Sequence, residues 1–425
     1  MRGWSPEQVA EAGGARLVRA GARDGGPDRA TIDSRDATAG ALFAGLPGAN
    51  VDGGAFAPQA LEAGAWGVLV GDAHAEAAAA APGDGAVLAA PDPLAALQRL
   101  ATSWRRALGA RVVGVTGSTG KTSTKDLLAA MVAQGRSVVA TAQNLNTEIG
   151  LPLTVLGAPA GTEVLVLEMA MRGAGQIAEL ATIAEPDVGV ITNIGPVHLE
   201  LLGSIEAIAR TKAELVGGLR TGGTAVVPHG EALLEPYRRD DVVWTTFGPE
   251  GDVRDLPDGL DIGFTSAHMR TNALAALAAA RAVGVEPTGR LEVALSGRRG
   301  QRRTTSGGVT VVDDCYNANP MSMRAALDDL AATAPGRKVA VLGDMLELGP
   351  EEGRLHEEVG RHARELGVDV LVAVGPRAAA MRGDAQVDDA AAAARLVPTL
   401  LREGDTVLVK ASRGVGLEAV VEAIA

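Results

Sequence analysis

The 425-residue chain is poor in aromatic side chains, which make up 2% of it, and it contains one cysteine, Cys315. A single thiol cannot form an internal disulfide, which fits a reducing compartment. The sequence also lacks a run of about 18 apolar residues that could cross a membrane, and its N-terminus lacks the apolar core of a signal peptide. We therefore expect a cytoplasmic protein without a membrane span, with cores of aliphatic side chains.

An excess of positive charge is missing as well. Lysine and arginine number 39 against 52 aspartates and glutamates, a net charge of −13. Such a chain has no electrostatic footprint for nucleic acid, so we expect no nucleic-acid partner. Anionic substrates would need local positive charge, which directs attention to any lysine inside a glycine-rich loop.

Hydrophobic periodicity predicts an α/β protein of three domains. Residues 1–107 contain short strand-like runs at Arg16–Arg19 and Trp66–Val70, and a helix is predicted over Pro93–Leu108. In residues 108–307 strands alternate with helices, which is typical of a mostly parallel sheet covered on both faces. The expected elements there are the strands Arg111–Thr116, Val164–Glu168 and Val188–Thr192 and the helix Lys121–Ala133.

A second alternating series follows in residues 308–425, with the boundary placed at Gly307–Gly308. Its predicted strands are Val309–Val312, Lys338–Leu342, Val370–Val374 and Thr406–Lys410. Its predicted helices are Ser322–Ala332, Leu355–Leu366 and Ala390–Leu401. We interpret this series as a third α/β domain.

The segment Thr116–Ser123, TGSTGKTS, lies between a predicted strand and a predicted helix, which is the context of a phosphate-binding loop. Gly117 and Gly120 would let the backbone curl so that N–H groups and the helix N-terminus face phosphate oxygens. Lys121 would reach the β- and γ-phosphates of ATP, and Thr122 would offer a hydroxyl to Mg²⁺. The first glycine of the common GxxxxGK[ST] pattern is missing, so an ordinary strand–turn–helix is the alternative.

Two further residues follow predicted strands at the edge where parallel sheets bind ligands. Glu168 closes one strand and His198 follows the next, so both could converge on a phosphate-bound Mg²⁺. Each also has a plain structural interpretation, Glu168 as a solvated strand end and His198 as a structural histidine. Lys212 lies on a predicted helix, where a solvated charge is the usual reading, and His356 is interpreted as part of a solvated helix face.

Seven ordered segments resemble the Mur ligase family. They are TGSTGKTS (116–123), NLNTEIGLPLT (144–154), LEMAMRGAGQI (167–177), NIGPVHLELLGS (193–204), DDCYNANPMSM (313–323), LGDMLELG (342–349) and VKASRG (409–414). The block DDCYNANP followed by GDMLELG looks like the members that add D-alanyl-D-alanine.

The resemblance implies a fold and an activity. The first domain would bind the UDP-muramoyl-peptide, the central one would be a P-loop ATPase, and the third, dinucleotide-fold-like domain would bind the incoming dipeptide. The reaction would join D-alanyl-D-alanine to UDP-N-acetylmuramoyl-tripeptide through an acyl phosphate, using ATP and two Mg²⁺ ions. This is the last cytoplasmic step of peptidoglycan precursor synthesis, on which cell shape and division depend, and we expect a monomer to carry it out.

The same resemblance assigns roles by motif. Those implied for catalysis are Lys121, Glu168, His198 and Lys212. Those implied for Mg²⁺ are Thr122, Glu168, His198 and Lys212, the lysine as a CO₂-derived carbamate. Those implied for ATP are Gly117, Ser118, Thr119, Gly120, Lys121, Thr122, Ser123, Asn272, Arg299 (or its neighbour Arg298), Asp314 and Asn317. Those implied for the substrates are Ser34, Arg35, Asn144, Asn146, Thr147, Tyr316, Asn319, Lys410 and Arg413.

Three other functions compete with this one. A sister Mur ligase or a folylpolyglutamate-type ligase would use another amine or acid. A nucleotide-dependent kinase or switch would leave the third domain without a role. A non-catalytic scaffold would be expected to lack the metal ligands, yet Thr122, Glu168 and His198 are present.

Overall fold

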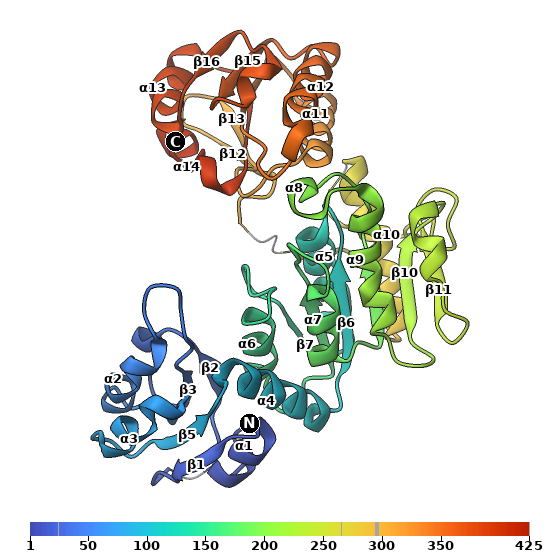
Figure 1. Ribbon diagram of the computed structural model, residues 1–425. Helices are drawn as coiled ribbons and strands as arrows, with labels where there is room; N and C mark the ends of the chain where they lie inside the picture. Colours follow the sequence, from blue (N-terminus) through green and yellow to red (C-terminus); the bar gives the residue numbers. More distant parts are fainter. Residues whose placement is uncertain (24, 265, 294–296, 425) are drawn as a thin grey trace.

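The chain folds into three α/β domains arranged along its length (Figure 1). The structure is a computed structural model that describes residues 1–23, 25–264, 266–293 and 297–424. Each domain contains one sheet, and the central domain lies between the other two in the chain. This confirms the fold class that the periodicity predicts.

The first domain contains a five-stranded sheet in the order β1-β5-β4-β3-β2. Strand β1 pairs antiparallel with β5, and the other neighbours are parallel. Its strands are β1 (Arg16–Arg19), β2 (Arg29–Thr31), β3 (Ala41–Ala44), β4 (Gly67–Gly71) and β5 (Ala86–Ala90). Its helices are α1 (Pro6–Gly13), α2 (Ala57–Glu62), α3 (Asp72–Ala80) and α4 (Pro93–Leu108), with the short 3-10 helices η1 (Ser34–Asp36) and η2 (Gly53–Phe56).

The central domain has a six-stranded sheet in the order β11-β10-β9-β6-β8-β7, and all its neighbouring strands are parallel. Its strands are β6 (Arg111–Thr116), β7 (Val138–Ala140), β8 (Val164–Glu168), β9 (Val188–Ile191), β10 (Thr224–Pro228) and β11 (Val243–Phe247). Its helices are α5 (Lys121–Ala133), α6 (Gly150–Leu156), α7 (Gln176–Ala184), α8 (Leu199–Leu202), α9 (Ile205–Gly217), η3 (Ala232–Tyr237) and α10 (Ala267–Ala282). Because β9, β6 and β8 are adjacent and parallel, the loops after them leave the same edge.

The third domain has a six-stranded sheet in the order β12-β13-β17-β14-β15-β16. Its strands are β12 (Gln301–Thr304), β13 (Thr310–Asp313), β14 (Lys338–Gly343), β15 (Val370–Val374), β16 (Ala385–Val387) and β17 (Thr406–Lys410). Its helices are α11 (Pro320–Thr333), η4 (Gly349–Glu351), α12 (Glu352–Glu365), η5 (Ala378–Met381), α13 (Ala390–Leu400), η6 (Arg413–Val415) and α14 (Glu418–Ile424). Strand β12 precedes the boundary expected at Gly307–Gly308, yet it belongs to this sheet because it pairs antiparallel with β13.

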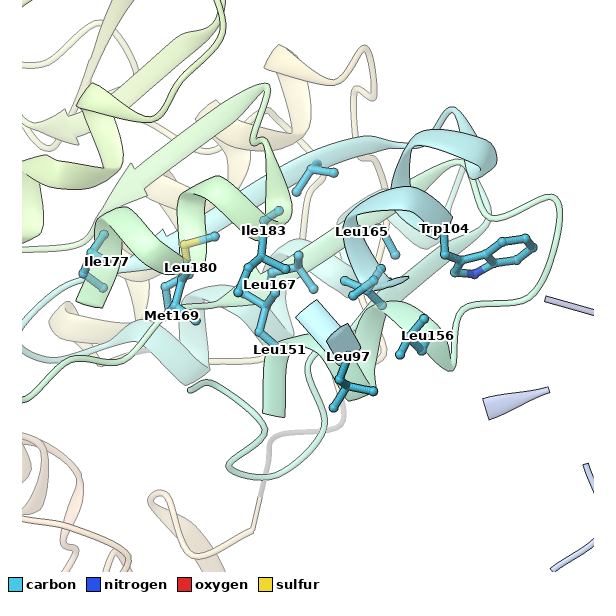
Figure 2. Packing of buried hydrophobic residues seen from close by; sticks show 14 of the residues in the cluster. Leu97, Trp104, Leu151, Leu156, Leu165, Leu167, Met169, Ile177, Leu180 and Ile183 are labelled. Carbon is cyan, nitrogen blue, oxygen red and sulfur yellow. The ribbon is translucent and has the colours of Figure 1, made fainter. Parts of the chain in front are cut away.

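Helix α4 connects the first two domains and is buried on one face. It begins at the N-cap Asp92, whose side chain accepts a hydrogen bond from the Ala95 N–H, and it ends at Gly109 in the left-handed conformation. Figure 2 shows Leu97 and Trp104 of α4 packed with residues of α6, β8 and α7 in one cluster. Burying a leucine side chain contributes roughly 1.5–3 kcal/mol, so this cluster holds the first and central domains together as a single core.

The strand and helix predictions agree closely with the structure. The elements expected at Arg16–Arg19, Pro93–Leu108, Arg111–Thr116, Lys121–Ala133 and Val164–Glu168 coincide with β1, α4, β6, α5 and β8. In the described ranges, every helix is too short or too polar to span a bilayer.

Candidate active site

The predicted phosphate loop connects β6 to α5 in the central domain. Gly117 has a φ of +148°, and a Cβ there would lie 1.8 Å from the Thr192 hydroxyl oxygen, so the loop tolerates only glycine at this point. Gly120 has a φ of +76° and forms the N-cap of α5. The loop therefore delivers the N-terminus of α5, with its partial positive charge, to the edge of the sheet.

The segment after β9 anchors this loop from one side. Ser118 N–H donates to the Asn193 carbonyl at 3.1 Å, and Thr119 N–H donates to Asn193 Oδ1 at 2.9 Å. The Ser118 hydroxyl donates to the Gly195 carbonyl and accepts from the Gly195 N–H. Two of the loop N–H groups, those of Ser118 and Thr119, are thus bonded to Asn193 and hold the loop in place.

Glu168 is buried, which excludes the alternative interpretation of this residue as a solvated strand end. Its side chain lies against the phosphate loop, where Thr122 Oγ1 donates to Glu168 Oε2 at 2.7 Å. Asn146 Nδ2 donates to the other carboxylate oxygen at 2.9 Å. The hydroxyl and the carboxylate that were predicted to bind Mg²⁺ are therefore direct neighbours.

Two buried or partly buried lysines lie near this edge. Lys121 Nζ donates to the Gly117 carbonyl at 2.7 Å. Burial lowers the pKa of Lys121, while the charge of Glu168 raises it and that of Arg299 lowers it. Lys212 lies on α9 and is 2% exposed, so it is not the solvated charge that a helix lysine usually is. Burial, assisted by the charge of Lys121, holds the pKa of Lys212 well below its ordinary value.

A cavity of about 2340 Å³ lies between the central and third domains. It gathers most of the residues predicted for ATP, metal and substrates. Its lining includes Ser118, Thr119, Gly120, Lys121, Thr122, Ser123, Asn144, Asn146, Thr147, Glu168, His198, Asn272, Arg298, Arg299, Asp314, Tyr316, Asn317, Asn319, Lys410 and Arg413.

Two arginine side chains, Arg299 and Arg413, lie over the ring of Tyr316 at the cavity. The Arg299 guanidinium carbon lies 4.3 Å from the centre of the Tyr316 ring, and that of Arg413 lies 5.6 Å away. Arg298 instead contacts the Cys315 sulfur at 3.7 Å and lies within 3.7 Å of Glu418. Both arginines line the cavity, but Arg299 is the one that stacks on Tyr316 and whose charge lowers the pKa of Lys121.

Lys410 is buried and bonded within its own domain. Its Nζ donates to Asp314 Oδ2 at 2.7 Å and to the Asn317 carbonyl at 2.9 Å. These bonds hold together the end of β17 and the loop after β13. Asn319 in that loop caps α11, where its side chain accepts from the Ser322 N–H at 3.0 Å.

His198 forms the N-cap of α8 and has a φ of +54°. Its Nδ1 bonds to the carboxylate of Glu347, a residue of the third domain. Burial lowers the pKa of His198, and the Glu347 carboxylate opposes this effect.

Four predicted site residues, Ser34, Arg35, Gly117 and Lys212, are not among the residues that line this cavity. Ser34 and Arg35 belong to η1 in the first domain, and the Arg35 guanidinium is paired with Asp33 at 2.6 Å. Lys212 is buried on α9, where the charge of Lys121 lowers its pKa and its own charge lowers the pKa of His198.

His356 is fully buried, so its interpretation as part of a solvated helix face was wrong. Its Nε2 accepts from the Met345 N–H at 2.9 Å, and its Nδ1 lies 2.7 Å from the Glu352 carbonyl. A carbonyl only accepts, so Nδ1 carries the proton and the ring is neutral. The ring supports the GDMLELG loop that carries Glu347, a role that no sequence spacing indicates.

The phosphate loop, the buried carboxylate beside it and a third α/β domain closing the cavity define a nucleotide-dependent ligase of the Mur type. Residues 29–105 match the Mur ligase family catalytic domain, residues 115–262 the Mur ligase middle domain, and residues 298–413 the Mur ligase glutamate ligase domain. The chain belongs to the Mur ligase family.

Within this family it is similar to the ligases that add D-alanyl-D-alanine. A UDP-N-acetylmuramoyl-tripeptide--D-alanyl-D-alanine ligase from Synechocystis is 39% identical to it, over 92% of this chain and 90% of the relative. The structure of MurF from Acinetobacter baumannii has a TM-score of 0.86 at 28% identity and covers 99% of this chain and 98% of its own. MurF ligase from Thermotoga maritima in complex with ADP has a TM-score of 0.79 at 31% identity, over 93% and 96% of the two chains.

Proposed function

We propose that the protein joins D-alanyl-D-alanine to UDP-N-acetylmuramoyl-tripeptide, with cleavage of ATP to ADP and phosphate. The observation that supports this proposal is the hydrogen bond from Thr122 to Glu168, a hydroxyl and a carboxylate beside the loop that would together bind the metal. The same cavity is lined by the DDCYNANP block of the third domain. Nucleotide, acid and amine would therefore meet at one edge of the central sheet.

The acid must be activated before an amide can form, since a carboxylate is a poor electrophile. A carboxylate oxygen of the tripeptide attacks the γ-phosphorus, the bond to the β–γ bridging oxygen breaks, and ADP leaves. Lys121 and the N-terminus of α5 stabilise the negative charge on the transferring group. The neutral amine of the dipeptide then attacks the acyl carbon, and phosphate departs from the tetrahedral intermediate.

The residues present fit Mg²⁺. Within the described ranges, no group of three or more His, Cys, Asp or Glu side chains could hold a metal alone. Mg²⁺ commonly takes one or two carboxylates together with substrate phosphates, so a complete protein cage is not required. Thr122, Glu168 and His198 would hold it with the phosphates of ATP, where it would neutralise charge on them.

Lys212 would complete this site as a carbamate. In the part of the chain that the structure describes, its ammonium group has neither a hydrogen bond nor an ion pair, although the residue is buried. A buried unpaired cation is costly, and the neutral amine that burial favours is the form that adds CO₂. The neutral amine attacks CO₂, the nitrogen–carbon bond forms, one proton leaves the nitrogen, and the resulting carbamate is an anion that the nearby Lys121 would attract.

The remaining assignments concern residues that line the cavity and the ligand that each would bind. Asn272, Arg299, Asp314 and Asn317 would bind the nucleotide from both sides, and Asn144, Asn146 and Thr147 would face the muramoyl-peptide. Tyr316, Asn319 and Arg413 would line the dipeptide site. Lys410 would act through Asp314 and Asn317, to which it is bonded.

The first domain would hold the UDP end through Ser34 and Arg35. Arg35 is exposed and paired with the neighbouring Asp33, so its guanidinium is accessible to an anionic ligand. We propose that the protein acts as a monomer in the cytoplasm, where ATP and its UDP-linked substrate are found.

ADP release tests the proposal. Purified UDP-muramoyl-tripeptides ending in diaminopimelate or in lysine are incubated with ATP, Mg²⁺ and either D-alanyl-D-alanine or single amino acids. We expect ADP release that requires both the tripeptide and the dipeptide. Release with a single amino acid in preference to the dipeptide would indicate a sister ligase, and release without any amine would indicate a kinase or hydrolase.

A further inference from the structure

Glu347 belongs to the third domain, yet its side chain is bonded to two residues of the central domain. One carboxylate oxygen accepts from His198 Nδ1, and the other accepts from the Arg172 guanidinium at 2.8 Å. Its main-chain carbonyl accepts from the Glu200 N–H at 3.3 Å. Figure 1 shows the place of this contact, where α8 reaches toward the third domain. No role of Glu347 follows from the motif in which it lies.

The backbone on both sides of this contact is constrained. His198 and Glu347 have φ values of +54° and +63°, a left-handed region that non-glycine residues seldom adopt. A Cβ at Gly349 would lie 3.2 Å from the Glu200 Cα, so the two chains are closely packed. Leu199 also packs against the hydrophobic core of the third domain. The bond between Glu347 and His198 is therefore supported by the fold on both sides.

This bond determines which nitrogen of His198 is available. A carboxylate only accepts hydrogen bonds, so Nδ1 carries the proton, and the lone pair of Nε2 is left for another partner. His198 lines the same cavity as Lys121 and Glu168. Histidines that bind metals commonly donate their other N–H to a carboxylate, which fixes the tautomer and the orientation of the ring.

We propose that Glu347 is a positioning residue, whose carboxylate orients His198 toward the nucleotide-bound metal when the third domain is docked on the central domain. The inference rests on the proposed function. It makes assembly of the metal site depend on a residue that arrives with the other domain. Docking of the third domain on the central domain and affinity for Mg²⁺–nucleotide are thereby coupled through the Glu347 side chain.

Three variants separate orientation of His198 from docking alone. Glu347→Gln keeps the size of the side chain but removes the charge that fixes the ring. Arg172→Gln removes the other cross-domain ion pair and leaves His198 bonded. Glu351→Gln is the matched control, because Glu351 pairs with Arg354 inside the third domain at 2.7 Å.

The measurement is the affinity of the full chain for a non-hydrolysable ATP analogue, by calorimetry with and without Mg²⁺. We expect Glu347→Gln to weaken binding by about 10- to 100-fold in the presence of Mg²⁺ and to leave binding without Mg²⁺ unchanged. Arg172→Gln and Glu351→Gln should keep the Mg²⁺ dependence of the unmodified protein. Glu347→Asp keeps the charge on a shorter side chain, so its affinity for the analogue with Mg²⁺ should lie between those of the unmodified protein and Glu347→Gln. This variant also provides the test if Glu347→Gln does not fold.

Equal losses in Glu347→Gln and Arg172→Gln would overturn the inference, since docking alone would then explain both. Unchanged Mg²⁺ dependence in Glu347→Gln and Glu347→Asp would overturn it as well. The binding assay contains neither tripeptide nor amine. A protein that fails to ligate D-alanyl-D-alanine would therefore refute the proposed function without affecting this readout.

Discussion

Burial of single charged or polar side chains determines much of the chemistry of this protein. Lys212 is buried without a partner in the described part of the chain, whereas Lys410 is buried and bonded to Asp314. The first arrangement suits a side chain that is to be modified, and the second suits one that supports a loop. The same residue type thus lies in two different surroundings, for which we propose two different roles.

For Lys212 we predict that Lys212→Ala lowers turnover by about 100-fold or more, the loss typical of removing one charge-stabilising group. Small carboxylates such as formate or acetate should restore part of the activity, since they supply the missing anion. Lys338→Ala is the control, because Lys338 donates to the Leu366 carbonyl in the third domain. If small carboxylates leave the turnover of Lys212→Ala unchanged, the proposal that Lys212 carries a carbamate is contradicted.

For His356 we predict a pH-dependent contribution to stability. Burial lowers its pKa in the folded protein, while the unfolded chain has the ordinary value of about 6.5. The unfolded chain therefore binds more protons as the pH falls through that value, and stability is full above it and decreases below it.

The test compares His356→Leu with the unmodified protein by denaturant unfolding. The variant leaves the Met345 N–H without its acceptor, at a cost of about 1–3 kcal/mol near pH 7.5. This cost should shrink toward about pH 5.5, because only the unmodified protein loses stability through this histidine. A cost that stays constant over the range would contradict a buried neutral ring.

Among the elements, the loop between β6 and α5 has a tightly restricted geometry. The close approach of Gly117 to Thr192 and the bonds from Ser118 and Thr119 to Asn193 fix its course between β6 and α5. Any side chain at Gly117 would push the loop away from β9. The position of the α5 N-terminus relative to Glu168 depends on this fit.

Gly117→Ala should therefore weaken binding of an ATP analogue by about tenfold or more, the effect of 1–3 kcal/mol of backbone strain at the site. The matched control is Gly173→Ala, because nothing lies within 4 Å of a Cβ at Gly173. Calorimetric titration measures both variants. Equal affinities in the two would show that the loop does not hold the phosphates.

Most of the regular elements could be predicted from the sequence, since strands such as Val164–Glu168 are buried apolar runs and α4 has a clear amphipathic pattern. Strand β12 was missed because its residues are all exposed and polar, so its pairing with β13 leaves no hydrophobic signal. Glu347 and His356 were missed for another reason. Their partners lie far along the chain or on the backbone, and only the folded structure brings them together.

In the whole molecule, the two interdomain connections differ in kind. The first and central domains share a hydrophobic core around α4, and Arg105 of that helix donates to the Ala184 carbonyl at 3.0 Å. The third domain meets the central one across the large cavity and through the Glu347 contacts. The contacts around this cavity are polar except for the packing of Leu199 against the third-domain core, and they are easier to rearrange than a continuous shared core, so we expect the third domain to be the moving part.

Small-angle X-ray scattering should detect this motion. We predict a smaller radius of gyration when a non-hydrolysable ATP analogue and UDP-muramoyl-tripeptide are both bound, because closure excludes water from a hydrolysable acyl phosphate. The analogue alone serves as the comparison. Scattering curves that coincide with and without both ligands would contradict closure.

The most direct test of the account follows an oxygen atom. The terminal carboxylate of the tripeptide is labelled with ¹⁸O, and the phosphate released during ligation with D-alanyl-D-alanine is analysed by mass spectrometry. If the acid is activated by the γ-phosphoryl group held at Lys121, one labelled oxygen passes to phosphate for each amide bond formed. Phosphate free of label, with the amide formed at the normal rate, would contradict an acyl phosphate and with it the proposed role of the phosphate loop.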